Sequence, residues 1–331
     1  MRKFFAKIPQ ILKPYGSRLT GLKPTSSRRW RVMNSTFQWK VTCLLVAFTI
    51  TMAILAGAGL QAAPATDIDD TEVFFRREKE VQVPIIMYHL VTENNRYVGK
   101  YGIRPSQLEE DLKYLKENGY NTVVMQDLIN FVEKGKRLPK NPIVLTFDDG
   151  NSSDYHFLFP LLKEYDMKVV ISIIGSATDK YTKDLEKNPT AKFPNLTWMQ
   201  VKEMHDEGIV EVQSHGYDVH GSAGSGKLRR ESADAYHRRL VSDLTKLQDR
   251  CEEHLGVKPN TFCYPLGIIG KGSQAVLEEM GFVASLSCQE GINIIKQGEK
   301  DCLFKLNRNN RPSGRSIDKV LEDIWKSVEK R

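Results

Sequence analysis

Two adjacent acidic residues at the end of an apolar run are the first candidates for chemistry in this sequence. Asp148 and Asp149 follow the run 143–147 and are followed directly by Gly150. A short apolar run that ends in glycine indicates a buried strand leading into a loop. Neighbouring carboxylates repel each other, so they persist either because they share a proton or because a cation neutralises them.

Two histidines further along the chain favour the cation. His215 follows the predicted strand 210–214, and His220 lies five residues later. Two imidazoles and one carboxylate can hold a divalent metal ion while leaving positions open for water and a carbonyl oxygen, as a hydrolytic site requires. Taken singly, each residue also has an ordinary role, because an Asp can cap a helix and a His can be a hydrogen-bonded core or surface residue.

The candidate residues follow the ends of several predicted strands. His89 comes after the run 83–87, and the segment 264–267 comes after a run that begins at Thr261. Short apolar runs alternate with amphipathic helices from residue 82 onward. We expect strands at 83–87, 122–125, 143–147, 169–174, 210–214, 261–264, 283–287 and 303–306, and helices at 105–118, 128–134, 155–164, 198–207, 232–255, 273–280 and 317–329.

The joints between these elements repeat one device. Gly119, Gly208 and Gly281 each end a predicted helix immediately before an apolar strand, where glycine supplies the left-handed cap conformation. Thr197 with Gln200 predicts a capping box, and Trp198 beside it is better explained by packing than by stacking on a sugar. Alternating strands and helices over about 250 residues predict an α/β fold with a parallel sheet, most simply a closed or distorted βα barrel.

Three motifs carry a resemblance to a known family. Residues 146–150 (TFDDG) resemble the signature of the polysaccharide deacetylases, the NodB-homology family or carbohydrate esterase family 4, and residues 214–220 (SHGYDVH) resemble its histidine motif. Residues 83–89 (VPIIMYH), with the later Leu138-Pro139, resemble the circularly permuted branch that contains poly-N-acetylglucosamine deacetylases. The resemblance spans about residues 83–311 and implies a distorted (β/α)7-type barrel.

The resemblance implies a role for several residues. Asp149, His215 and His220 match the ligands of a divalent metal ion, usually Zn²⁺, and Asp148 matches the general base, which takes a proton from water as it attacks an acetamide carbonyl. Leu266 matches the residue whose backbone N–H donates to the developing oxyanion, a role that does not depend on its side chain.

Two departures from the family pattern need explanation. No His follows His254, so the usual C-terminal general acid is missing. In the permuted branch the equivalent His lies early in the chain, and His89 matches it, so the resemblance implies that His89 is the general acid. Cys263 stands where many members carry an Arg that pairs with the catalytic Asp. We expect Arg308 to reach Asp148 from another strand instead, although a solvated surface charge is the alternative for this residue.

The positive charge of the chain belongs to its N-terminal part. The formal net charge is +7, but residues 1–65 hold ten Lys or Arg and no Asp or Glu. The remainder has 38 basic and 41 acidic residues, which argues against a nucleic-acid-binding protein. Residues 41–60 contain no charge, and twenty helical residues at ~1.5 Å each span a bilayer core of roughly 30 Å.

These features predict four parts in the chain. We expect a basic cytoplasmic tail at 1–40, a transmembrane signal-anchor at 41–63, an extracytoplasmic stalk at 64–82 and a deacetylase domain at 83–331. The alternative for the apolar segment is a cleaved signal peptide, which would release the domain. Cys251, Cys263, Cys288 and Cys302 would then be outside the cytoplasm, and Cys288 with Cys302 is the first candidate for a disulfide.

The sequence therefore predicts a membrane-anchored, metal-dependent hydrolase that removes N-acetyl groups from an N-acetylglucosamine-containing polysaccharide outside the cell membrane. Poly-N-acetylglucosamine is the favoured substrate and peptidoglycan the alternative. The metal could be zinc, cobalt, nickel or manganese. A catalytically silent glycan-binding protein is the alternative of another class, which the complete set of Asp148, Asp149, His215 and His220 argues against.

Overall fold

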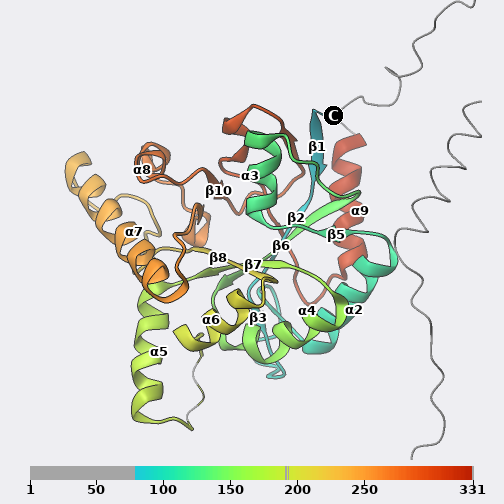
Figure 1. Ribbon diagram of the computed structural model, residues 1–331, viewed down its shortest axis with the longest axis horizontal. Coiled ribbons are helices and arrows are strands. Elements are labelled where there is room, and N and C mark those ends of the chain that lie inside the picture. The colour runs from blue at the N-terminus through green and yellow to red at the C-terminus, as the bar shows by residue number, and fades with distance from the viewer. Residues whose placement is uncertain (1–78, 191, 193, 330–331) are drawn as a thin grey trace, which may run out of the picture. The chain divides into compact units, whose positions relative to one another are not determined.

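The apolar runs of the sequence form a parallel sheet in the computed structural model, which describes residues 79–190, 192 and 194–329 (Figure 1). The order across the sheet is β10-β9-β8-β7-β6-β2-β12, and a further short strand, β5, pairs with β6. The strands are β2 Ile85–Tyr88, β5 Asn121–Thr122, β6 Pro142–Asp149, β7 Val169–Ile173, β8 Val210–Ser214, β9 Thr261–Cys263, β10 Ala284–Leu286 and β12 Asn309–Asn310.

The segment 306–310 contacts strands near both ends of the sheet, so the sheet is curled. Leu306 bridges to Leu286 of β10, and three residues later Asn309 pairs with Ile86 of β2. The backbone N–H of Ser287 also donates to the Leu306 carbonyl at 2.8 Å. The predicted α/β fold with a parallel sheet is thus confirmed, and the sheet is curled.

Helices surround the sheet and join successive strands (Figure 1). Two short strand pairs lie beside it, β1 Glu80–Val83 with β11 Asn293–Lys296 and β3 Leu90–Val91 with β4 Gly102–Ile103. The helices are α2 Pro105–Glu117, α3 Met125–Lys134, α4 Phe159–Tyr165, α5 Gly175–Lys187, α6 Trp198–Asp206, α7 Ala233–Leu255, α8 Ser273–Glu279 and α9 Ile317–Glu329. Single turns of other helix types occupy Asp154–Leu158, Pro265–Gly267 and Lys300–Leu303.

Local signals placed several of these boundaries correctly. Gly119, Gly208 and Gly281 have φ values of 71°, 72° and 81°, so each adopts the left-handed conformation that ends its helix. Thr197 and Gln200 form the predicted capping box at the start of α6. Trp198 next to them is only 2% exposed, which confirms packing as its role.

The side chains of β6 alternate between two sides of the sheet. Ile143, Leu145 and Phe147 pack with the helices on the outer side, whereas Val144 packs with residues of the other strands inside the curl. Because side chains along a strand point alternately to opposite faces, Thr146 and Asp148 share the inner side with Val144. This alternation brings the first aspartate of the pair into the interior of the curled sheet.

Some predicted elements are wrong. The expected strand 303–306 is replaced by the turn Lys300–Leu303 and the single bridge at Leu306, because Lys305 takes a left-handed φ of 58° that interrupts an extended run. The expected strand 122–125 ends at Thr122, and α3 begins at Met125. Helix α5 was not predicted, because few of its side chains are apolar and its buried residues are Gly175, Thr178 and Asp179.

Cys288 and Cys302, the first candidates for a disulfide, are not bonded to each other, since the four cysteines of the described region are free thiols. Cys302 Sγ accepts a hydrogen bond from the Lys296 backbone at 3.4 Å, while Cys288 Sγ lies 3.8 Å from Met87 Sδ. The predicted tail and signal-anchor and most of the stalk lie outside the described residues. Within residues 79–329 as described, we find no helix with the length and hydrophobicity needed to cross a bilayer.

Candidate active site

The two aspartates of TFDDG diverge at the end of β6. Asp148 belongs to the inner face and is 1% exposed, whereas Asp149 has a left-handed φ of 74° that turns the chain out of the strand. The loop 194–196 holds this turn from the other side, because Leu196 N–H donates to the Gly150 carbonyl and the Asn195 amide donates to the Asp149 carbonyl. The left-handed conformation at Asp149 separates the directions of two neighbouring carboxylates.

Asp149 is brought together with both predicted histidines. Its Oδ1 lies 3.5 Å from Nε2 of His215 and 3.2 Å from Nε2 of His220. Despite these short contacts, Oδ1 is buried and has no hydrogen-bond partner within the described part of the chain. An unsatisfied buried carboxylate oxygen facing two imidazole nitrogens fits a divalent cation between them.

The hydrogen bond of His215 determines which nitrogen can bind a cation. Its Nδ1 lies 2.9 Å from the Cys263 carbonyl oxygen, which can only accept, so Nδ1 carries the proton. Burial lowers the pKa of His215, which favours the neutral ring. The Nε2 lone pair is therefore directed toward Asp149 and is available as a ligand.

A second group of possible ligand atoms lies close by but fits a cation less well. Atoms of Asp148, His215 and Cys263 fall within 4.8 Å of one another. Burial raises the pKa of the Cys263 thiol well above its ordinary value, so this group is not a thiolate. Both oxygens of Asp148 already accept hydrogen bonds from Arg308. Asp149, His215 and His220 are therefore the better set of metal ligands.

Arg308 is the side chain that binds Asp148. Its Nη1 donates to Oδ1 at 2.7 Å and its Nη2 to Oδ2 at 2.9 Å, and the residue is 0% exposed. Arg308 Nε also donates to the Ser287 carbonyl at 2.7 Å, which fixes the guanidinium plane. Arg308 therefore contacts Asp148 from the segment that joins the two ends of the sheet, and it is not a solvated surface charge.

This contact determines the protonation of Asp148. Burial raises the pKa of the carboxyl, but the guanidinium of Arg308, followed by His215 and His89, outweighs burial and holds the pKa below its ordinary value. Asp148 is consequently ionised at neutral pH and can accept a proton. Cys263 Sγ lies 3.4 Å from Asp148 Oδ1, at the place where the resemblance led us to expect an Arg.

His89 reaches the same carboxylate from the end of β2. Its Nε2 is 3.8 Å from Asp148 Oδ2, and its side chain is 19% exposed. The amide of Asn151 donates to the backbone carbonyls of both His89 and Asp148, at 3.4 and 3.2 Å. His89 is thus at the opening of the site, close to the ionised carboxylate of Asp148.

Leu266 lies three residues after Cys263, in the turn Pro265–Gly267. Its φ of 57° and ψ of 11° place it in the left-handed region, and its side chain is 57% exposed. The carbonyl of Pro265 and the loop glycine Gly224 are packed so tightly that a Cβ on Gly224 would meet that oxygen at 2.7 Å. The turn Pro265–Gly267 is therefore held against the loop that follows His220, and the apolar side chain of Leu266 is directed to solvent.

Sequence reasoning missed the groups that support these residues. The Thr146 hydroxyl lies 3.2 Å from Arg308 Nη1, and the amides of Asn151 and Asn195 hold the backbone on either side of Asp149. Thr146 was visible as part of TFDDG, but neither asparagine has a signal in the sequence, because each acts through a contact that depends on loop packing.

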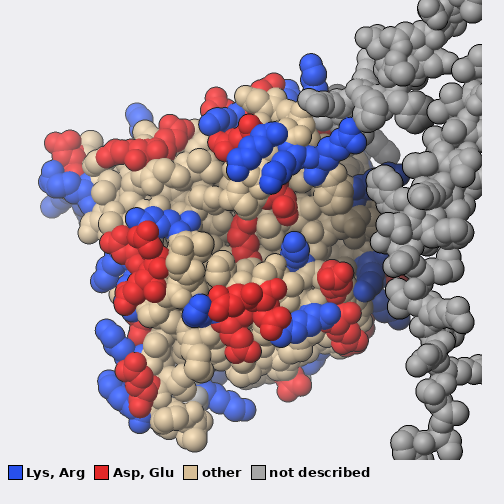
Figure 2. All heavy atoms as spheres, viewed as in Figure 1, with Lys and Arg blue, Asp and Glu red and all other residues tan. Residues whose placement is uncertain are grey.

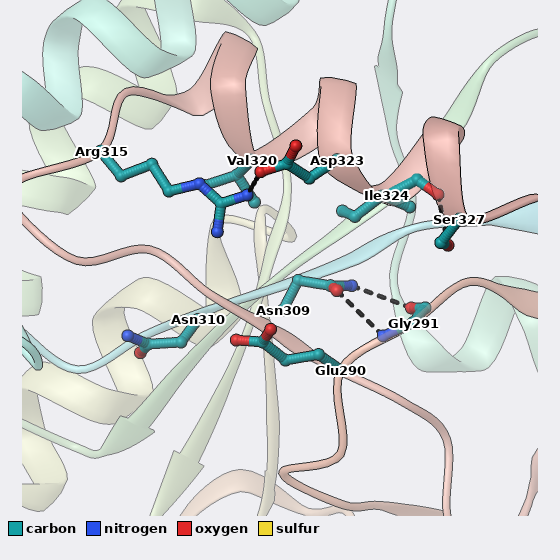
Figure 3. A pocket seen from close by; sticks show the side chains of 9 residues that line it. All are labelled: Glu290, Gly291, Asn309, Asn310, Arg315, Val320, Asp323, Ile324 and Ser327. Carbon is teal, nitrogen blue, oxygen red and sulfur yellow. Dashed lines mark hydrogen bonds and ion pairs between the residues drawn. The ribbon is translucent and has the colours of Figure 1, made fainter.

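A polar pocket lies between helix α9 and the segments around Gly291 and Asn309 (Figure 3). It has a volume of about 170 Å³, and its polar side chains largely bind one another, because Arg315 pairs with Asp323 and Asn309 with the backbone of Gly291. It contains none of the predicted site residues. Its lining is Glu290, Gly291, Asn309, Asn310, Arg315, Val320, Asp323, Ile324 and Ser327.

The chain is similar in sequence to known proteins. Residues 135–285 match the family model described as polysaccharide deacetylase. The chain is 27% identical over 249 residues to the poly-beta-1,6-N-acetyl-D-glucosamine N-deacetylase of Escherichia coli K12, covering 69% of this chain but only 37% of that protein. It is 23% identical over 262 residues to the enzyme of the same name from Staphylococcus aureus N315, covering 75% and 86%.

A solved structure shares the fold. A de-N-acetylase from Aggregatibacter actinomycetemcomitans superimposes with a TM-score of 0.62 and 26% identity, over 73% of this chain and 99% of that one. The family match covers β6 to β10, and these strands carry the aspartate pair, His215 and Cys263. The resemblance found in the motifs is thereby confirmed, and residues 135–285 belong to a polysaccharide deacetylase domain.

Proposed function

We propose that this protein is an extracytoplasmic, metal-dependent N-deacetylase that acts on an N-acetylglucosamine-containing polysaccharide, with poly-β-1,6-N-acetylglucosamine as the favoured substrate. The observation that carries the proposal is the division of the aspartate pair. Asp149 faces His215 and His220 with an unsatisfied oxygen, and Asp148 is held ionised by Arg308 next to them. A silent glycan-binding protein has no need for this arrangement.

The reaction divides between the residues as follows. A divalent ion held by Asp149, His215 and His220 would polarise the acetamide carbonyl and supply an acidified water. Asp148 takes the proton of the attacking water, and the backbone N–H of Leu266 donates to the oxygen that becomes negative. His89 then gives a proton to the leaving nitrogen, so that the products are acetate and the free amine of glucosamine.

The substrate class is supported by the relatives. Two of them, from Escherichia coli and Staphylococcus aureus, are named as poly-beta-1,6-N-acetyl-D-glucosamine N-deacetylases. The position of His89 early in the chain agrees with the permuted branch. Peptidoglycan remains the second candidate substrate, because it presents the same acetamide on a β-linked glucosamine.

The location outside the membrane is proposed from the sequence. The uncharged segment 41–60 follows a basic tail without acidic residues, so the domain would be exported and anchored. In the described part of the chain, Lys and Arg are interspersed with Asp and Glu on the face drawn in Figure 2, which is unlike a continuous basic surface for nucleic acid.

Acetate release tests the proposal directly. The purified full-length protein, loaded with Zn²⁺, should release acetate from β-1,6-linked N-acetylglucosamine oligomers, and a chelator should abolish the release until metal is restored. Release of acetate from peptidoglycan alone would show that peptidoglycan, and not poly-β-1,6-N-acetylglucosamine, is the substrate. Absence of release from both, in a protein shown by metal analysis to hold one equivalent, would refute the enzymatic function.

A further inference from the structure

An exposed tyrosine lies against the ring of His89. The ring centroids of Tyr101 and His89 are 4.8 Å apart with an angle of 54° between the planes. The side chain of Tyr101 nevertheless remains 48% exposed, so much of its ring faces solvent at the opening of the site. The motifs assign no role to this residue, which precedes β4.

The backbone beneath this ring is firmly held. Three consecutive carbonyls accept hydrogen bonds from two other parts of the chain, the segment 310–313 and Leu90. Gly99 O accepts from Ser313 N at 2.9 Å, Lys100 O from the Asn310 amide at 2.8 Å, and Tyr101 O from Leu90 N at 3.0 Å. A half-exposed aromatic ring on a fixed backbone is a preorganised binding surface, because little conformational entropy is lost when a ligand covers it.

Close packing within the loop adds to this rigidity. A Cβ on Gly102 would lie 2.0 Å from the carbonyl oxygen of Tyr97, so the two ends of the loop touch through a position that only glycine can occupy. Tyr97 itself is 56% exposed, and no ring contact between it and His89 is found among the described residues. It therefore provides a matched control on the same loop.

The contact also explains how His89 is oriented. Its Nδ1 is buried and has no hydrogen-bond partner in the region that the structure describes, and its Nε2 is 3.8 Å from Asp148 Oδ2. With so few polar restraints on the imidazole, the aromatic contact with Tyr101 limits its rotation. A sugar lying on the exposed part of the tyrosine ring would be next to the proposed proton donor.

We propose that Tyr101 forms a binding subsite for a pyranose ring of the substrate, beside the sugar whose acetamide reacts. The C–H groups of a β-linked sugar form an apolar face that suits an aromatic ring. The ammonium of exposed Lys100 lies 4.9 Å from the centroid of this ring and would move aside for the sugar. This inference rests on the proposed function and adds the recognition of a second sugar.

Binding to an inactive background separates the subsite from catalysis. In Asp148→Asn protein loaded with Zn²⁺, calorimetry should show that Tyr101→Ala weakens binding of a β-1,6-linked N-acetylglucosamine tetramer by ~10-fold, about 1.4 kcal/mol. Tyr101→Phe should bind like the parent, because the ring is retained. Tyr97→Ala should also bind like the parent, since it removes an exposed tyrosine from the same loop.

Kinetics of the active enzyme give a second readout. Tyr101→Ala should raise KM for the tetramer by ~10-fold, whereas the control variant Tyr97→Ala should leave KM for the tetramer within about twofold of wild type. A melting temperature close to that of wild type will show that the exposed side chain is not needed for folding.

Three results would overturn the subsite. These are an unchanged affinity in Tyr101→Ala, an equal loss in Tyr97→Ala, or a loss in Tyr101→Phe as large as in Tyr101→Ala. If the Asp148→Asn parent itself fails to bind the tetramer and wild type releases no acetate from it, the proposed substrate is wrong, and with it the pyranose as ligand of Tyr101.

Discussion

The guanidinium of Arg308 binds both carboxylate oxygens of Asp148, at 2.7 and 2.9 Å, although the two residues are 160 positions apart. Both side chains are buried, near the place where Leu306 bridges to Leu286 and the sheet curls back on itself. A bidentate arginine fixes the carboxylate plane as well as its charge. The same contact thus holds this region of the sheet together and keeps Asp148, the proposed base, ionised and oriented.

Replacing Arg308 should alter the pH dependence of the reaction. Because Arg308 lowers the pKa of Asp148, Arg308→Met should raise that pKa, and the acidic limb of the kcat/KM profile should move to higher pH. Arg308→Lys keeps the positive charge, so the limb should move less while the rate still falls. The pH–rate profiles of the three proteins provide the measurement.

Folding must be monitored in these variants, because removal of one partner from a buried ion pair typically costs about 3–5 kcal/mol. Denaturant unfolding and metal content should be measured alongside the rates. If Arg308→Met retains the wild-type profile in a folded, metal-loaded protein, Arg308 does not set the protonation of Asp148.

The two aspartates should respond differently to substitution. Asp149→Ala should lose bound metal, because it removes the oxygen that faces both histidines. Asp148→Asn should retain metal and lose turnover by ~10²-fold or more, because the amide cannot accept a proton. Metal stoichiometry by elemental analysis and acetate release measure the two effects separately. The reverse outcome, with metal lost only in Asp148→Asn, would exchange the two roles.

The role proposed for His89 depends on the leaving group. In His89→Gln, hydrolysis of N-acetylglucosamine oligomers should fall by ~10²- to 10⁴-fold, because an amine needs a proton to leave. Hydrolysis of an aryl acetate, whose phenolate leaves without protonation, should fall much less. Comparing the two substrates on one enzyme preparation controls for changes in folding or metal content, and equal losses on both would exclude His89 as the general acid.

Trp198 should matter for stability and not for substrate binding. Its ring is buried, its Nε1 donates to Asp179 Oδ1 at 2.7 Å, and it stacks on His254 with centroids 4.5 Å apart. Trp198→Ala should lower the free energy of unfolding by about 3–5 kcal/mol. Among molecules that remain folded, KM for the oligomer should be unchanged, and a large rise in KM would instead support a sugar-binding role.

The elements that carry strong local signals were predictable. Strand β6 contains the apolar run Ile143 to Leu145, and β8 begins directly after the helix-ending Gly208 and Ile209. Glycines such as Gly119 and Gly208 end their helices through a local backbone preference. Helix α5 was missed because its buried residues, Gly175, Thr178 and Asp179, form no apolar pattern. The strand expected at 303–306 is absent because the left-handed Lys305 interrupts the extended run.

The sequence by itself determined the types and order of the candidate catalytic residues, because TFDDG and the two histidines need specific chemical groups at specific spacings. Only the tertiary structure decided between the two alternatives for Arg308, in favour of contact with Asp148, and showed that Asn195 supports Asp149 and that Tyr101 lies against His89. These contacts arise where the curled sheet brings its ends and loops together, and no local pattern records them because the partners are far apart in the chain.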